Sequence, residues 1–132
     1  MIQIIFNGIP PSINSAYCTN FKTGRRFPSK ELADFKKEFA RLKRPAQADI
    51  EVLKDKRLCL LIELWCAPSR VYTKKGTVKK WDISNCIKSL EDAASDMLGI
   101  DDSHFFRVVI EKKVTELPET TYITIMENRT CS

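Results

Sequence analysis

The sequence has 132 residues, which is enough for one domain with a hydrophobic core of its own. Its 43% hydrophobic and 30% charged residues fit a soluble globular protein, and no apolar run reaches membrane-spanning length. Five cysteines without a C-x-x-C pair argue against a disulfide framework and against a zinc site, so we expect a cytosolic protein. The net charge of +5 is by itself only a mild indication of an anionic partner.

The first half of the chain predicts a strand, a basic segment and a helix. Residues 2–6 have the pattern of a first strand. The polar and basic segment over 12–28 is either a mobile loop or a short hairpin. Ser29 is the expected N-cap of a helix that continues to about Pro45, and residues 46–56 form a polar stretch.

The second half predicts a central strand, a second helix and two more strands. The strand over 57–67 is apolar on both faces, which is typical of the middle of a covered sheet. A broad apolar stripe predicts a helix over 83–98, ended by Gly99. The β-rich runs 105–114 and 121–126 indicate an antiparallel hairpin. The expected fold is therefore α/β, a single-domain two-layer sandwich whose mixed sheet has about four strands and two main helices, in the order β-α-β-α-β-β.

Two loops without acidic residues carry much of the positive charge. Either loop alone could be an ordinary solvated loop. Phe21, Tyr72 and Trp81 lie within or beside them and are able to stack on bases, which favours a nucleic-acid partner. The expected DNA-binding residues are, in the first loop, Lys22, Arg25 and Arg26, beside Lys30, and, in the second, Arg70, Lys74, Lys75, Lys79 and Lys80.

Carboxylates, an amide and a lysine follow the second basic loop. Asp82 is a natural N-cap, Asn85 and Lys88 are ordinary polar helix residues, and Asp101 and Asp102 could form a turn. The functional alternative is that these acids hold a metal ion against nucleic acid, because acidic residues otherwise avoid phosphate. Each residue alone is weak evidence for either role.

Taken together, the residues resemble a nuclease signature. The stretch DISNCIKSLEDAASDMLGIDDSHF, which begins at Asp82, is similar to the RusA type of Holliday-junction resolvase, with its pattern D-x-D-N-x-x-K, then D-x-L, then D-D. The segment PPSINSAY, which begins at Pro10, is similar to the family's P-P-S-x-N-x-x-Y segment. The resemblance covers most of the chain. It implies a homodimeric, magnesium-dependent endonuclease that nicks four-way DNA junctions in recombination and repair, in the cytoplasm of a bacterium or from a phage, with no membrane partner.

The resemblance also implies a role for each matching residue. Asp82 and Asp102 would bind Mg²⁺, with Mn²⁺ as a possible substitute, and the metal would orient a water and stabilise charge on the phosphate. Lys88 would be the catalytic-site lysine, which either neutralises the phosphate or assists the attacking water. The other matches are Asn14 and Asn85 as supporting residues and Asp101 as the adjacent acid.

Ser84 departs from the family pattern, which has a second aspartate at this position. A neutral hydroxyl is a poorer ligand for Mg²⁺ than a carboxylate, so metal binding is weakened unless Asp92 or Asp101 compensates. Asp92 lies on the same polar helix face as Asn85, which makes it the stronger candidate. A catalytically impaired member that binds branched DNA without cutting it therefore stays open.

The predicted helix separates the two main carboxylates. Sixteen residues span about 24 Å, and the segment after Gly99 returns by about 10 Å at most. Asp82 and Asp102 of one chain would then stay more than about 10 Å apart, too far to share one ion. We therefore expect two such helices to pack antiparallel in a homodimer, with each site shared between subunits.

Two other classes of protein and one further residue remain open. A non-catalytic nucleic-acid-binding protein would show salt-sensitive binding without cleavage. A small-molecule phosphohydrolase would use the same carboxylates and metal, but would have little need for two basic loops. His104, beside the acidic pair, could polarise a water, although we expect a structural or exposed role.

Overall fold

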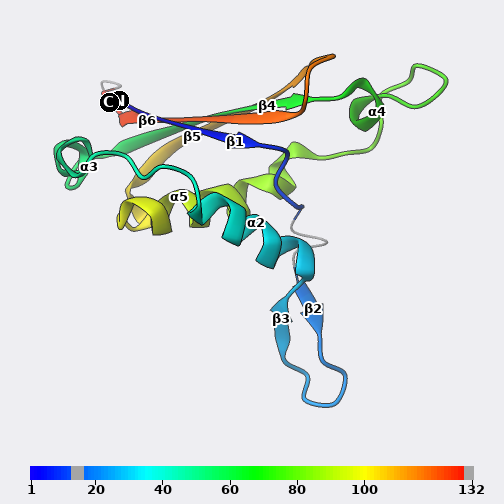
Figure 1. The fold of residues 1–132 in the computed structure, drawn as a ribbon, viewed down its shortest axis with the longest axis horizontal. Coiled ribbons are helices and arrows are strands. Elements are labelled where there is room, and N and C mark those ends of the chain that lie inside the picture. The colour runs from blue at the N-terminus through cyan, green and yellow to red at the C-terminus, as the bar shows by residue number, and fades with distance from the viewer. Residues whose placement is uncertain (13–16, 130–132) are drawn as a thin grey trace.

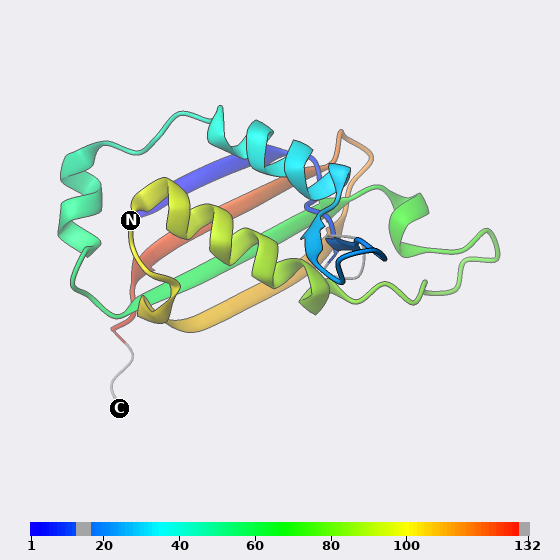
Figure 2. The ribbon, with the colours of Figure 1, turned by 90° about the horizontal axis from the view of Figure 1, so that it is seen from below.

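Four strands form one mixed sheet, and two main helices cover one of its faces (Figures 1 and 2). The computed structural model describes residues 1–12 and 17–129. This architecture confirms the predicted fold class. The strands are β1 (Ile2–Asn7), β4 (Leu58–Cys66), β5 (Phe105–Val114) and β6 (Thr120–Glu127), and the two helices are α2 (Lys30–Ala40) and α5 (Ile87–Leu98).

The strand order in the sheet is β1-β6-β4-β5, so β4 occupies the middle, as its apolar sequence predicted. It pairs antiparallel with β6 and parallel with β5. The prediction that β5 and β6 form an antiparallel hairpin was wrong, because β4 lies between them. A strand that is apolar on both faces gains most from neighbours on both sides, and α5 supplies the crossover that a parallel β4–β5 pair requires.

Alternate residues of the strands form the core. Leu58, Leu60, Ile62 and Leu64 of β4 are at most 1% exposed and face the helices. Phe6 of β1 packs against two phenylalanines of α2, with ring centroids 5.0 and 6.0 Å away. The opposite face of β4 is less well covered, because no helix packs there among the described elements (Figure 1).

Both main helices begin at the predicted caps, but α2 ends at Ala40, before the predicted end near Pro45. The Ser29 side chain accepts a hydrogen bond from the backbone N–H of Leu32 and caps α2. The predicted helix over 83–98 is a short 3₁₀ helix, η1 (Ile83–Cys86), that continues into α5. Gly99 ends α5 in the left-handed conformation, with φ of 66°.

Three short helical elements were not predicted. They are α3 (Gln47–Leu53), α4 (Pro68–Val71) and the 3₁₀ helix η2 (Asp102–His104). The helical pattern of α3 is not visible in the sequence of the polar stretch over 46–56, because only Ile50 and Leu53 of that helix are buried. Within the described part of the chain, no helix is long and apolar enough to cross a membrane.

Two basic segments project from the end of the molecule where α5 begins (Figures 1 and 2). The first is the hairpin of β2 (Tyr17–Thr19) and β3 (Arg26–Pro28), so the hairpin alternative for the segment over 12–28 is the correct one for its described residues. The second follows α4 and is closed by an antiparallel bridge between Tyr72 and Val78. Both basic segments therefore lie on the same side of the protein as Asp82.

Candidate active site

Two carboxylates hold the side chain of Lys88. Its Nζ lies 3.0 Å from an Asp92 oxygen and 3.2 Å from an Asp102 oxygen. Lys88 and Asp92 are one turn apart on α5, and the turn after Gly99 brings the first residue of η2 back to the same place. Because both oxygens contact one nitrogen, they are at most 6.2 Å apart, the sum of the two distances. We call these three residues the Lys88 cluster.

The Lys88 cluster keeps its lysine charged. The hydrogen bond to Asp92, followed by the one to Asp102, raises the pKa of Lys88 above its ordinary value. A lysine that holds its proton at neutral pH is a poor general base, so the geometry favours neutralisation of a phosphate over activation of a water. Glu91, which the sequence analysis missed, lies beside the cluster. Burial raises the pKa of its carboxyl, against the attraction of Lys88.

Asp82 lies outside the Lys88 cluster and is held by Ser84. Its Oδ1 accepts hydrogen bonds from the Ser84 backbone N–H at 3.0 Å and from the Ser84 hydroxyl at 2.7 Å. The hydroxyl bond, followed by the backbone bond, lowers the pKa of Asp82, so the carboxylate is ionised at neutral pH. Within residues 1–12 and 17–129, no hydrogen bond or ion pair joins Asp82 to Lys88 or Asp102.

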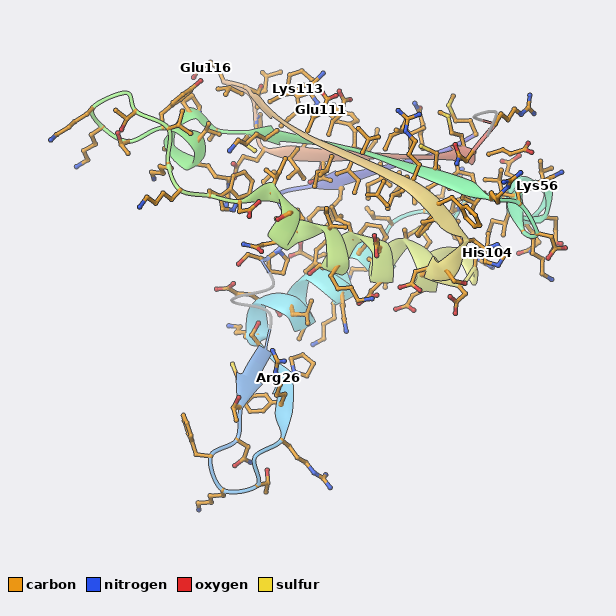
Figure 3. The ribbon with its side chains drawn as sticks, turned by 180° about the vertical axis from the view of Figure 1, so that it is seen from behind. Arg26, Lys56, His104, Glu111, Lys113 and Glu116 are labelled. Atoms are coloured by element: carbon orange, nitrogen blue, oxygen red, sulfur yellow. The ribbon has the colours of Figure 1, made fainter. Side chains whose placement is uncertain are left out.

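The other expected site residues have local structural contacts or lie outside the described residues. Asp101 caps η2 by accepting the N–H of Ser103 at 2.8 Å, and this bond lowers its pKa. The backbone N–H of Asn85 donates to the Asp82 carbonyl at 3.2 Å. Nδ1 of His104 lies 3.1 Å from the Lys56 carbonyl, which fits the expected structural role (Figure 3). Asn14 lies outside the described residues.

The chain offers two carboxylates in one place as metal ligands. Magnesium is commonly bound by one or two carboxylates together with waters and substrate phosphates, so Asp92 and Asp102 suit it chemically. Among the described residues there is no group of three or more acidic, histidine or cysteine side chains that could hold a metal. Metal binding by Asp82 together with Asp102, or with help from Asp101, stays a prediction.

The second basic segment has a fixed base and an exposed tip. Arg70 makes two hydrogen bonds to Glu119, at 2.7 and 2.9 Å, and the Lys79 ammonium donates to the Ser69 carbonyl at 2.6 Å. These two cations therefore stabilise the segment itself. The exposed side chains that carry its charge outward belong to Lys74, Lys75 and Lys80.

Trp81 is less suited to base stacking than its sequence position suggested. The Arg70 guanidinium lies 5.6 Å from the centroid of its ring, and the Lys112 ammonium lies 5.8 Å away. Lys112 also donates to the Trp81 carbonyl at 3.2 Å. The indole is thus engaged within the protein by two cations.

The two separated sequence motifs meet at the start of α5. The Pro10 carbonyl accepts a weak hydrogen bond from the buried Cys86 thiol at 3.7 Å, and the Pro11 carbonyl accepts one from the Ser89 hydroxyl at 3.4 Å. Burial raises the pKa of Cys86 to about 11, so the thiol stays protonated and acts as a small core residue. The proline segment thereby packs against the helix that follows Asp82.

The model of the endodeoxyribonuclease RusA family matches residues 8–126, which includes both motifs and the Lys88 cluster. The chain belongs to the RusA endodeoxyribonuclease family. A comparison with curated proteins finds no match. Family membership gives the reaction class, hydrolysis within a DNA strand, and the matched range contains Asp82, Lys88 and Asp102.

Proposed function

We propose that this protein is a magnesium-dependent, structure-selective endodeoxyribonuclease that resolves Holliday junctions during DNA recombination and repair. One observation carries the proposal: within the range matched by the family, two carboxylates converge on the protonated Lys88. Carboxylates beside a fixed cation are a suitable environment for a metal ion and a phosphate group.

The residues of the site divide the work between them. Asp82 and Asp102 would hold Mg²⁺, and Asp92 would replace the second aspartate of the family pattern, where this chain has Ser84. A bound metal would supply charge stabilisation and an oriented water. Lys88 donates to a non-bridging phosphate oxygen and neutralises the charge that develops during attack. The exposed lysines of the second basic segment contact backbone phosphates, which positions the DNA without reading its sequence.

A homodimer would complete the site. Asp82 precedes η1, whereas Asp102 lies beside Lys88 and Asp92 on α5, and no hydrogen bond or ion pair among the described residues joins it to Asp82. Two copies of α5 packed antiparallel about a two-fold axis would bring Asp82 of one chain near the partner's Asp102. Two equivalent sites related by that axis suit two symmetric cuts in opposed strands.

Ser84 favours a second candidate, a family member that binds branched DNA without cutting it. Its hydroxyl donates to Asp82 at 2.7 Å, so it orders that carboxylate and adds no negative charge to the site. If Asp92 does not compensate, the metal would be held too weakly for hydrolysis while the basic segments still bind DNA.

A cleavage assay separates the two candidates. The protein is incubated with Mg²⁺ and a synthetic four-way junction whose strands carry separate end labels, and linear duplex of the same sequence is the control. Paired nicks in opposed strands of the junction, absent with Asp82→Asn, support the nuclease. Tight binding with an intact junction supports the binding-only candidate, and equal cutting of duplex and junction contradicts selectivity for branched DNA.

A further inference from the structure

The tip of the β2–β3 hairpin presents one aromatic side chain to solvent. Phe21 is 98% exposed, which is the largest exposed fraction among the large hydrophobic residues of the described chain. By contrast, the three phenylalanines that join β1 and α2 are at most 5% exposed. A single exposed apolar residue is common on protein surfaces, so exposure alone implies no function. A function of Phe21 therefore depends on the residues that surround it.

The turn that carries Phe21 is held by its own backbone. The N–H of Gly24 donates to the Asn20 carbonyl at 2.7 Å, and the N–H of Asn20 donates to the Arg25 carbonyl at 2.8 Å. The Asn20 side chain accepts the N–H of Lys22 at 2.9 Å, and Gly24 takes the positive φ of 70° that closes the turn. None of these bonds uses the Phe21 ring, so the turn does not depend on the ring for its stability.

Basic residues neighbour Phe21 along the chain, on a hairpin that reaches away from the sheet (Figure 1). Lys22 and Arg25 are exposed in the same turn, and Arg26 follows on β3 (Figure 3). Cations that contact phosphates around an aromatic ring that stacks on a base are the usual combination for unpaired nucleic acid. A continuous duplex hides the faces of its bases, whereas the centre of a branched DNA exposes or strains them. The hairpin also lies at the end of the molecule that carries the second basic segment.

We propose that Phe21 packs against an unstacked base at the branch point of the DNA, while Lys22 and Arg25 contact the adjacent phosphates. An apolar wedge of this kind selects DNA that unstacks at low cost and rejects regular duplex. Phe21 is thus a specificity residue for branched DNA. This inference rests on the proposed function, because it needs a junction as the ligand.

Binding and base environment are measured together on a four-way junction that carries 2-aminopurine beside the branch point, with the same label inside a linear duplex as control. Phe21→Ala should weaken junction binding by about 5- to 150-fold and leave duplex binding unchanged. It should also abolish the fluorescence change that the wild-type protein produces at the branch point. Phe21→Trp should restore both. Val52→Ala, an exposed apolar residue on α3 at the opposite end of the molecule, is the matched control and should change neither.

The salt dependence distinguishes stacking from charge. Phe21→Ala should leave the slope of log affinity against log salt unchanged, whereas Lys22→Ala should reduce it by about 1. This inference fails, while the proposed function stands, if the wild-type protein binds or cuts junctions and Phe21→Ala does so equally well. It also fails if Phe21→Ala alters the oligomeric state, because the ring would then belong to a protein interface. If the wild-type protein does not bind junctions, the proposed function fails and this inference with it.

Discussion

Replacement of Arg70 by alanine tests whether this cation stabilises the fold or contacts DNA. The change removes two hydrogen bonds to Glu119, at 2.7 and 2.9 Å, together with the contact over Trp81. Hydrogen bonds to charged groups contribute about 1.5–3 kcal/mol each when buried. The Arg70 and Glu119 side chains are 39% and 23% exposed, so water replaces part of this loss, and we expect about 1–3 kcal/mol in total. For 132 residues, that lowers Tm by about 4–11 °C.

Thermal unfolding and salt-dependent DNA binding provide the two measurements. Because Glu119 already holds Arg70, the Arg70→Ala variant should show the lower Tm and the wild-type slope of log affinity against log salt. Lys75→Ala, an exposed residue at the tip of the same segment, should show the reverse: an unchanged Tm and a slope smaller by about 1. An Arg70→Ala variant with wild-type Tm and a reduced slope would refute the structural role.

Three further changes address the site. Lys88→Met should slow nicking by about 100- to 1,000-fold while junction binding persists. Because the pKa of Lys88 is raised from 10.5, the wild-type nicking rate should not decline between pH 7 and 9 through loss of the Lys88 proton. Ser84→Asp should lower the Mg²⁺ concentration that gives half-maximal nicking, and an unchanged titration would show that Asp92 already compensates. An equimolar mixture of Asp82→Asn and Asp102→Asn should regain nicking that neither variant shows alone, because mixed dimers contain one intact shared site. If each site is confined to a single chain, the mixture would stay inactive.

The sequence predicted the strands, main helices and caps well because each has a strong local signal. The alternation in β4, the apolar stripe of α5 and the glycine after it act over a few residues. The partner of β5 could not be predicted in this way. The neighbour of a strand depends on how strands far apart in the sequence are arranged in the sheet. The hairpin prediction considered only the short connection between β5 and β6. Helix α3 could not be predicted either, because its two buried residues are too few to show the helical spacing of apolar residues.

The candidate site shows the same division between local and distant information. Spacing along the helix places Lys88 and Asp92 on one face, one turn apart. The contact of Lys88 with Asp102 depends on how the chain returns after Gly99, so no periodicity reports it. Arg70 is the opposite case. As part of a basic run it was a natural candidate for DNA contact, and only the arrival of Glu119 from the β5–β6 connection engages it within the protein.

The sheet order has a consequence for the biosynthesis of the protein. Of the four strands in this sheet, β1 is synthesised first and its pairing partner β6 last, with Ile2 opposite Ile125. Until β6 has emerged, β1 lacks the strand it pairs with in the described sheet, and β4 lacks the neighbour on one of its sides. This sheet is therefore completed only after β6 has been synthesised. A prematurely terminated chain that lacks β6 cannot complete the sheet on which α5, the helix that carries Lys88 and Asp92, packs.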